Sequence, residues 1–485
     1  MPRGLTAPVL ACAAGLPGLA GGVFYNSNQS AEYIRCLDRN SALDAADIAY
    51  YNMAGTVRLR PGFSCNLSNQ TILQRATVRT VGNPALGDRA YGSRNPVWLV
   101  PNGYAVYRGN GWAAFTSLQS IGATAVRHWP DGLPNLDLAA KREAGYGGAP
   151  SRLMATDAYL DTLAGGGTPV RAQAAAAAAG LDAAPFPARS WVRGRSAFLA
   201  WRHGAALRLG PRFALALAGR LVYARQELQG EAVGAWVYAR RGQDGRAPGR
   251  ISLDVDLRAL GYSGEAGLDW FPAPGLVLSL TWEQATRLRF GTSVRNGRDG
   301  GGRFQDGRRA RLDLPQAWRF GCGWQAGPRW RVALGVNAYL EHSARLDLLD
   351  DPGAGIEARR DYRDTWEEAV ALEWRAAPRW LLSLGISVNQ IGQRRAAALD
   401  VGLAGAHADY LSLGAGFRYQ ATDRWRFTAG AAGTGFARRC RGADGLGDRP
   451  LKARFAALGA AADPRKDYDK RYLTLAFGVE CHLPR

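Results

Sequence analysis

Most of the chain alternates between apolar residues and polar or small residues with a period of two. From Trp330 to Leu340 every second residue is apolar, and the residues between them are Arg331, Ala333, Gly335, Asn337 and Tyr339. The runs from Trp380 to Val388 and from Leu473 to Val479 repeat this pattern. Because successive side chains of a β-strand point to opposite faces, the period predicts strands with one apolar and one polar face.

A short turn of one form recurs between these runs. It consists of a small or polar residue, then Pro or Asp, then Arg, then an aromatic residue. Its four copies are Gly210-Pro211-Arg212-Phe213, Gly327-Pro328-Arg329-Trp330, Ala377-Pro378-Arg379-Trp380 and Thr422-Asp423-Arg424-Trp425. Since Gly, Pro and Asp favour tight turns and an alternating run lies on each side, every copy predicts a β-hairpin.

The strands are long enough to cross a membrane. Each run is about ten residues, which is what a tilted strand needs to span the hydrocarbon core of a bilayer. A soluble β-sandwich or propeller alternates as well. Two features favour a membrane barrel: the connections at the other strand ends are long and polar, and the turn aromatics would form one belt at a membrane interface, namely Phe213, Trp330, Trp380 and Trp425.

We therefore predict an all-β fold, a transmembrane antiparallel β-barrel of about fourteen strands. The strands are expected at residues 61–79, 96–108, 111–126, 191–208, 211–228, 249–270, 275–291, 309–326, 329–346, 361–376, 379–393, 404–420, 424–437 and 470–483.

The residues before the first strand are assigned to two segments. Residues 1–20 are predicted to be a signal peptide, because Arg3 precedes an apolar run that ends in the small-residue site Gly18-Leu19-Ala20. Val9-Leu10-Ala11-Cys12 leaves a lipoprotein signal as the alternative. Residues 21–60 carry no strand alternation, so we expect them to fill the lumen as an N-terminal plug, or hatch.

The remaining residues, 61–485, are predicted to form the barrel, with one exceptional connection at 127–190. Leu153–Leu163 has helical spacing, and Ala174–Ala179 is a run of good helix formers. We expect a long, partly helical external loop whose apolar residues are candidates for capturing a hydrophobic ligand.

Composition excludes several other classes of protein. Of the 485 residues, 47% are hydrophobic, which excludes a disordered chain. The net charge of +20 comes almost entirely from arginines, and these are spread along the chain without a basic helix. A phosphate-rich membrane surface suits them, because Arg binds phosphate bidentately, and no nucleic-acid partner is expected. The cysteines that follow the signal peptide show neither a disulfide framework nor zinc spacing.

Catalytic motifs are not found in the sequence. The five histidines are scattered, without an HExxH motif, and there is no nucleophile elbow. Asp254 and Asp256 share one face of a strand and could act as an acid–base pair, but the wet wall of a barrel explains them better. We expect no enzymatic activity, no cofactor and no bound metal.

Three motifs resemble the FadL/TodX-type transporters of long-chain fatty acids and hydrocarbons. Asp47–Thr56, with the sequence DIAYYNMAGT, resembles that family's hatch motif D-A-x-x-x-Y-N-P-A-G. Leu312–Trp318 resembles its L-P-x-x-W strand opening, and Gly264–Phe290 its mid-barrel strand pair. The resemblance covers most of the chain. It departs at Met53, where the family has proline, and at the C-terminus, which lacks the usual terminal aromatic residue.

The resemblance implies a function in the bacterial outer membrane. We expect passive, hatch-gated diffusion of long-chain fatty acids or similar hydrophobic molecules through a plugged barrel. The expected partners are the hydrophobic small molecule and the lipid and lipopolysaccharide of the membrane, and we expect a monomer. The alternatives are a general porin or adhesin-like barrel without hydrophobe specificity and a soluble β-rich binding protein.

The candidate hatch residues lie in two places. Phe24 and Tyr25 are expected to enter the lumen and line a pocket. Asn52, Met53, Ala54 and Gly55 are expected to form the hinge of the hatch, because Gly permits a positive φ and Asn tolerates one.

Two arginines are candidates for ligand binding from the wall. Arg331 and Arg418 lie on the inward face of their strands. They are expected either to pair with a ligand carboxylate or to join ion-pair networks inside the lumen with residues such as Glu341.

Overall fold

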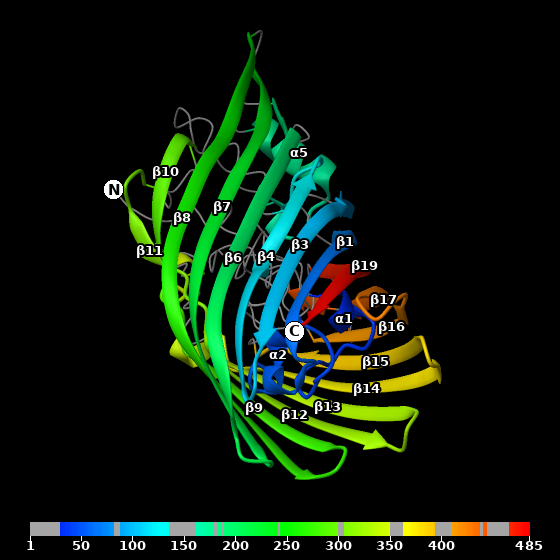
Figure 1. Ribbon diagram of the computed structural model, residues 1–485. Helices are drawn as coiled ribbons and strands as arrows, with labels where there is room; N and C mark the ends of the chain where they lie inside the picture. The colour runs from blue at the N-terminus through cyan, green and yellow to red at the C-terminus, as the bar shows by residue number, and fades with distance from the viewer. Residues whose placement is uncertain are drawn as a thin grey trace.

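The computed structural model describes residues 30–81, 88–134, 162–178, 182–185, 189–240, 243–298, 305–349, 362–392, 409–436, 440–443 and 465–485. Within these ranges the strands form one antiparallel sheet that closes into a barrel (Figure 1). The first strand, β1 (Gly62–Val81), pairs along its whole length with the last, β19 (Arg465–Pro484). The barrel predicted from the alternation is therefore confirmed.

The wall has fourteen strands in the described residues, several of them built from two consecutive segments. The segments between β1 and β19 are β2 (Arg89–Arg94), β3 (Val97–Arg108), β4 (Trp112–Trp129), β5 (Asp182–Pro185), β6 (Arg189–Leu209), β7 (Phe213–Arg240), β8 (Gln243–Ala273), β9 (Leu276–Glu283), β10 (Arg289–Arg298), β11 (Arg309–Arg311), β12 (Gln316–Ala326), β13 (Trp330–Leu340), β14 (Thr365–Ala377), β15 (Trp380–Gln390), β16 (Tyr410–Gln420), β17 (Trp425–Phe436) and β18 (Cys440–Ala443).

Helical elements are few and short. They are α1 (Ala31–Ile34), α2 (Ile48–Tyr51), η1 (Ala54–Arg58), α5 (Pro169–Ala178), η2 (Glu341–Ser343) and η3 (Asp347–Leu349). Of the two helical runs expected in the 127–190 connection, Ala174–Ala178 lies in α5, whereas most of Leu153–Leu163 lies outside the described residues. Among the described helices, none is both long and apolar enough to cross a membrane.

Two strands that the sequence predicted as continuous are interrupted. The expected strand 275–291 is split into β9 and β10, and the expected strand 309–326 into β11 and β12. A single bridge, Thr286↔Leu314, joins the two interruptions. Pro315 follows directly, and proline has no N–H to donate to a ladder. The Asp313 side chain instead accepts the N–H of Leu288 at 2.9 Å.

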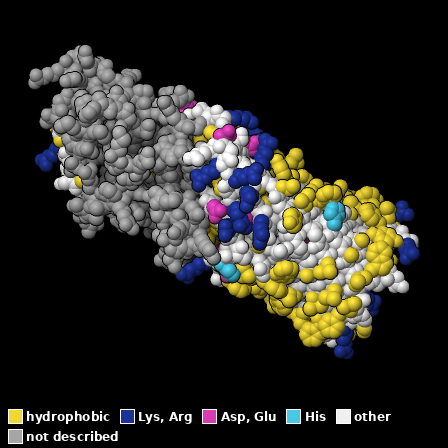
Figure 2. Space-filling model, turned by 90° about the vertical axis from the view of Figure 1, so that its left-hand side faces the viewer, with side chains coloured by type: hydrophobic (Ala, Val, Ile, Leu, Met, Phe, Trp, Pro, Cys, Tyr) yellow, Lys and Arg dark blue, Asp and Glu magenta, His cyan; other side chains and the backbone are white. Residues whose placement is uncertain are grey.

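The outward face is apolar over one part of the barrel. Figure 2 shows the hydrophobic side chains gathered in a band toward the short-turn end, with Lys and Arg at both margins. Leu334, Leu384 and Leu475 on this face are 48%, 60% and 44% exposed, so they pack against no other segment that would cover them. Such a band is what a lipid-solvated wall requires.

The turn aromatics lie where the repeat predicted them. Phe213, Trp330, Trp380 and Trp425 begin β7, β13, β15 and β17, all at the short-turn end, and each is between 41% and 45% exposed. Trp330 stacks on Trp374 with ring centroids 5.5 Å apart. Gly210 and Gly327, which open two of the repeated turns, have φ of 66° and 72°, a conformation that favours glycine.

A seam interrupts the backbone pairing between β3 and β4. Their ladder runs from Arg108↔Ala113 only as far as Gly103↔Leu118, although both strands continue beyond it. Where the ladder ends, the N–H of Ser120 donates to the side-chain Oδ1 of Asn102 at 3.2 Å. The register of β4 against β6 also shifts after Ser120. Fewer ladder hydrogen bonds therefore hold this part of the wall.

The described part of the N-terminal segment fills the lumen. Between Ser30 and Val57 every side chain is buried except those of Leu43 and Asp44, which are half-buried. The wall lets the backbone of this segment approach closely, because small residues face it. A Cβ added at Gly385 would lie 2.0 Å from the carbonyl oxygen of Cys36. We refer to residues 30–60 below as the hatch.

Candidate functional site: the hatch and its anchors

The hatch motif is a turn tied to the wall by one amide side chain. Asn52 ends α2, and its Nδ2 donates to the carbonyl oxygen of Ala42 at 3.2 Å and to Oδ2 of Asp269 in β8 at 3.1 Å. Its Oδ1 accepts the N–H of Gly55 at 3.2 Å. Asn52 therefore holds two parts of the hatch and one wall strand together.

Met53 takes the place of the proline found in the resembling motif and has a backbone conformation that proline could adopt. Its φ is −58°, which lies within the range that a proline ring imposes. Its carbonyl oxygen accepts the Thr56 hydroxyl at 2.7 Å, and its side chain is fully buried. The turn of η1 is thus formed here by the burial of Met53 and the Thr56 hydrogen bond instead of by a proline ring.

The expected conformation of the hinge glycine was wrong. Gly55 lies inside η1 and is absent from the described residues with a positive φ. It is required for a different reason, since an added Cβ would lie 2.6 Å from Nδ2 of Asn52 and 2.7 Å from Leu43. Close packing on the side chains of Asn52 and Leu43 replaces the left-handed turn that was predicted.

The first anchor of the hatch is the ring of Tyr50. It lies between the guanidinium groups of Arg202 (β6) and Arg319 (β12), which are 4.7 Å and 4.5 Å from its centroid. Arg319 also donates to the Tyr50 hydroxyl at 3.0 Å, and Arg202 to its carbonyl oxygen at 3.0 Å. Cation–π contacts of this kind are strongest where water is excluded, as it is here.

Two glutamates of the wall balance these guanidinium groups. Glu283 (β9) lies 2.6 Å from Arg319 and 2.9 Å from Arg220 (β7), and Glu265 (β8) lies 2.5 Å from Arg202. All five side chains are at most 1% exposed. Buried charges are tolerated only when paired in this way, so the network defines one position for Tyr50.

The second anchor is a set of ion pairs around Asp44. This carboxylate forms an ion pair with Arg39 of the hatch at 2.8 Å and accepts a hydrogen bond from Arg418 of β16 at 2.6 Å. Burial raises the pKa of Asp44, but Arg39, Arg418 and Arg35 outweigh it and hold the pKa well below its ordinary value. Asp44 is therefore ionised, and it binds the hatch to the wall.

A second group of ion pairs continues this anchor toward β14. Glu373 lies 2.5 Å from Arg35 of the hatch and 2.7 Å from Arg331 of β13. Glu32, which lies 2.7 Å from Arg35, is fully buried. Burial raises its pKa, but Arg35 and Arg418 overcome this and lower it to about 2.

The two candidate wall arginines are brought together by this anchor. Arg331 also donates to the carbonyl oxygen of Ser41 at 2.9 Å, so both it and Arg418 contact the hatch. Glu341, the expected partner, is not among their ion pairs: it lies in η2, ten residues along the chain from Arg331. A strand rises by ~3.3 Å per residue, which separates the two by roughly 33 Å.

The other candidates fall into three groups. Phe24 and Tyr25 lie outside the described residues. Ala54 lies beside Asn52 and Met53 at β8, where its backbone nitrogen would be 3.5 Å from a Cβ on Gly267. Asp254 and Asp256 lie on the wall strand β8, away from the hatch. Asp256 accepts hydrogen bonds from Arg225 and Arg258.

Several residues that anchor the hatch were not among the candidates predicted from the sequence. The missed wall residues are Arg202, Arg220, Glu265, Glu283, Arg319 and Glu373. All of them lie on the polar face of an alternating run, and a charged residue in the middle of such a face was a usable signal. Which charges meet across the lumen depends on strand register and tilt, which the period of two does not contain.

Comparison with solved structures shows the same fold. A FadL homologue of Pseudomonas aeruginosa is 12% identical, with a TM-score of 0.59 and coverage of 95% of this chain and 100% of that one. The toluene transporter TodX of Pseudomonas putida is 12% identical, with a TM-score of 0.56 and coverage of 96% and 100%. The toluene transporter TbuX of Ralstonia pickettii is 11% identical, with a TM-score of 0.51 and coverage of 90% and 94%.

No model of a known protein family matches the chain, and no curated protein matches its sequence. The structural likeness nevertheless extends over nearly the whole length of both chains in each comparison. The chain thus has the plugged-barrel fold of the FadL/TodX type.

Proposed function

We propose that this protein is a bacterial outer-membrane channel for long-chain fatty acids or similar hydrophobic small molecules. Cargo diffuses passively inward through the barrel and past the hatch, without a cofactor and without covalent chemistry. The observation that carries the proposal is the hatch itself: a buried segment that occupies the lumen and is clamped to the wall at Tyr50 and Asp44. A wide water-filled pore has no use for such a plug.

The outer surface supports the membrane location. An apolar band with charged margins and an aromatic row at the short turns matches the surface of an outer-membrane barrel. The pairing of β1 with β19 also closes the described sheet, so the backbone groups of these two strands find partners that the hydrocarbon could not supply. A hydrophobe gains about 0.8 kcal/mol per methylene on leaving water, so an apolar path is enough to draw it inward.

The nature of the two anchors is consistent with a hatch that moves during transport. Buried ion pairs specify geometry but add little net stability, because desolvation offsets their attraction. Such pairs give the plug a defined closed position while contributing little net free energy to holding it there.

Uptake of labelled oleate into proteoliposomes tests the proposal. We expect the protein to increase the initial rate at least about tenfold over protein-free vesicles, with little steady ion current across a planar bilayer. Equal uptake with and without the protein would refute the proposal. A large steady current in the unmodified protein would favour the general porin.

The hatch variant for this assay is Tyr50→Ala, with Tyr50→Phe as its matched control. Alanine removes the ring that Arg202 and Arg319 hold, so the steady ion current should rise. Phenylalanine keeps the ring and loses only the hydroxyl contact with Arg319, so its current should stay near that of the parent protein. Indistinguishable currents in all three proteins would mean that this anchor does not hold the plug.

A further inference from the structure

The first and last strands of the barrel meet along a line that no hairpin or loop joins. In the described wall, all other neighbouring strands are consecutive along the chain, whereas β1 and β19 are joined by non-covalent contacts. We call this line the closing seam. A covalent bond across it would close a longer loop of the chain than any hairpin does, and the stabilisation from a cross-link grows with the length of that loop.

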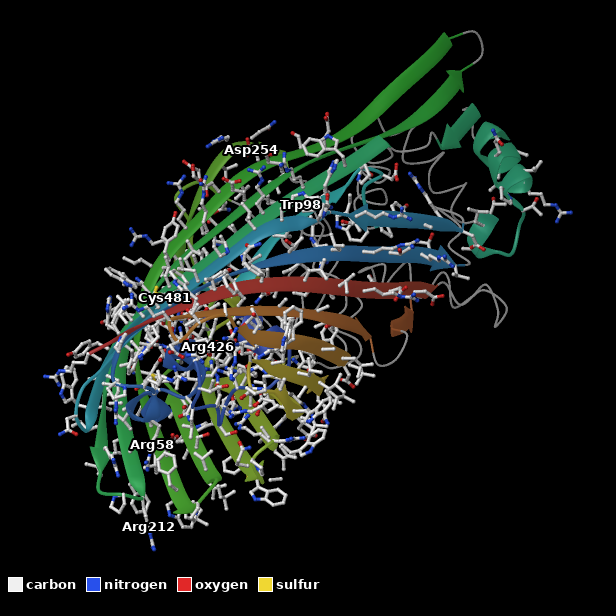
Figure 3. All side chains as sticks on the ribbon, turned by 45° about the vertical axis from the view of Figure 1, so that its right-hand side comes forward. Arg58, Trp98, Arg212, Asp254, Arg426 and Cys481 are labelled. Atoms are coloured by element: carbon white, nitrogen blue, oxygen red, sulfur yellow. The ribbon has the colours of Figure 1, made fainter. Side chains whose placement is uncertain are left out.

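Two cysteines lie opposite each other across the closing seam. Cys65 is the fourth residue of β1 and Cys481 is the fourth from the end of β19, and the register pairs them directly. Both are free thiols, half-buried on the outward face. Figure 3 shows Cys481 on the red strand β19, next to the blue strand β1. By contrast, Cys322 of β12 has Leu278 and Leu334 opposite it on the neighbouring strands.

The backbone geometry of this pair suits a disulfide. The N–H of His482 donates to the carbonyl oxygen of Arg424, beside β17, at 2.8 Å. Because the backbone groups of successive residues point alternately to the two neighbouring strands, those of Cys481 point to β1, and Cys65 is its hydrogen-bonded partner. The Cα atoms of such a pair are about 5.5 Å apart, which disulfides span. The Cβ atoms must approach by about 1 Å, a small shift so near the strand ends.

The pair lies where an oxidant in the periplasm can reach it. On the other side of Cys481, its register partner is Trp425, a member of the aromatic row at the short turns. Phe63 and Leu483, the next outward residues toward the strand ends, are exposed. The two thiols are therefore level with the membrane interface, at the end whose short turns face the periplasm. Disulfides form and persist in that compartment.

The inner side of the same seam holds the hatch. Glu480, which precedes Cys481, accepts the N–H of Ala46 at 2.8 Å and an N–H of the Asn66 side chain in β1 at 3.4 Å. Arg426 of β17 forms an ion pair with the same carboxylate. If the seam opened at this level, one contact between hatch and wall would be lost with it. A cross-link on the outer side keeps these inner groups in register.

We propose that Cys65 and Cys481 form a disulfide that closes the barrel covalently. The reaction joins the two Sγ atoms and releases two protons and two electrons. The oxidant is a thiol–disulfide oxidoreductase of the periplasm, whose own S–S bond breaks and whose two sulfur atoms take up the protons and electrons as thiols. The bond forms after β1 and β19 have paired, because only closure of the sheet makes the two thiols neighbours. This inference goes beyond the proposed function, since it holds for any cargo.

Peptide mapping of protein from outer membranes tests the disulfide. Cells are precipitated with acid, free thiols are blocked with N-ethylmaleimide in denaturant, and the purified protein is digested with trypsin without a reductant. We expect the peptide Leu59–Arg75 to be linked to Tyr472–Arg485, with Cys65 and Cys481 alkylated only after reduction. Cys322 is the internal control and should be alkylated without reduction.

The temperature at which the folded barrel unfolds in SDS measures what the bond does. Dithiothreitol should lower this temperature by roughly 5 °C or more, because a cross-link mainly restricts the unfolded chain. Cys65→Ser and Cys481→Ser should each show the lowered temperature and no further response to dithiothreitol. Cys322→Ser is the matched control and should respond to reduction as the parent protein does. If a seam variant does not fold, reduction of the folded parent protein makes the same comparison.

Three results would overturn the disulfide. They are alkylation of Cys65 and Cys481 in the parent protein before reduction, a linked peptide that appears only after a chemical oxidant is added, and an unfolding temperature that reduction leaves unchanged. None of these measurements depends on cargo, so a failure of oleate uptake would contradict the transport function and leave the disulfide standing.

Discussion

Asp38 is a buried carboxylate of the hatch that lies next to wall strand β13. Its Oδ1 accepts the N–H of Asn40 at 3.1 Å, and its Oδ2 has no hydrogen-bond partner among the described residues. Burial raises its pKa to about 6, against the lowering effects of Asn40, Arg331 and Arg39, while Glu367 adds to the rise. A docked hatch therefore prefers Asp38 protonated.

The pKa shift of Asp38 predicts that the hatch is held less tightly as pH rises. A raised pKa stabilises the docked state at low pH, and that stability is lost as pH rises through about 6. Between pH 4 and pH 7 the loss is on the order of 2 kcal/mol. Hydrogen exchange of residues 30–58 should therefore be faster, relative to its intrinsic rate, at pH 7 than at pH 4.

The variant Asp38→Asn tests this pH dependence. Asparagine cannot ionise, so most of the difference in hydrogen exchange between pH 4 and pH 7 should disappear. Asp254→Asn on the wall is the control and should leave it unchanged. Glu32 acts in the opposite direction at pH 4, since its lowered pKa of about 2 places its own loss of stability below pH 4.5. Because Glu32 is present in both proteins, the difference between Asp38→Asn and the parent protein at each pH isolates the effect of Asp38. A hatch equally protected at both pH values in the parent protein would contradict the assignment.

At the scale of elements, the hatch and the wall meet through backbone and not only through side chains. Gly385 of β15 and Gly321 of β12 face the hatch, where an added Cβ would lie 2.0 Å from the Cys36 carbonyl oxygen and 2.6 Å from the Asn40 carbonyl carbon. The small residues on the inward faces, visible in the alternation, are thus the contact surface for the plug.

Gly385→Ala should displace the hatch. The methyl group would overlap the Cys36 carbonyl, and overpacking of this kind costs about 1–3 kcal/mol. We expect a raised steady ion current in planar bilayers and faster hydrogen exchange in residues 31–40. Gly219→Ala in β7 adds the same methyl where nothing lies within 4 Å, so it should behave as the parent protein does. Equal ion currents for Gly385→Ala and Gly219→Ala would show that the added methyl group at Gly385 does not displace the hatch.

At the scale of the molecule, the barrel wall extends well beyond its apolar band, because some strands are much longer than others. β7 and β8 have 28 and 31 residues, several more than the sequence predicted. They rise beyond the other strands in Figure 1, because two strands paired with each other satisfy their backbone outside the membrane as well as inside it. The apolar band occupies only the part nearer the short turns (Figure 2).

Spin labels test which part of the wall faces lipid. In a background without other reactive cysteines, labels at Leu334→Cys, Leu384→Cys and Leu475→Cys should be relaxed more strongly by oxygen, which concentrates in lipid, than by a water-soluble nickel complex. A label at Arg212→Cys on the short turn should show the reverse order. Equal access of the nickel complex to the three leucine positions would contradict the membrane placement.

The amino-acid sequence by itself determined the barrel, the end of it that carries the short turns and the outward apolar face. These follow from the period of two and from the turn repeat, both of which are local properties of the chain. The resemblance to a transporter motif also predicted the hinge of the hatch at Asn52–Gly55, which stays a prediction, whereas the conformation expected of Gly55 was wrong.

Only the tertiary structure decided which inward charges meet. Tyr50 is held by Arg202 and Arg319, more than one hundred residues apart in the chain, and Asp44 is held by Arg418. A cavity on the short-turn side of the hatch is likewise lined by residues of the hatch and of several hairpins. The closure of the sheet, its register and its tilt bring these groups together, and electrostatic pairing acts only at the resulting distances.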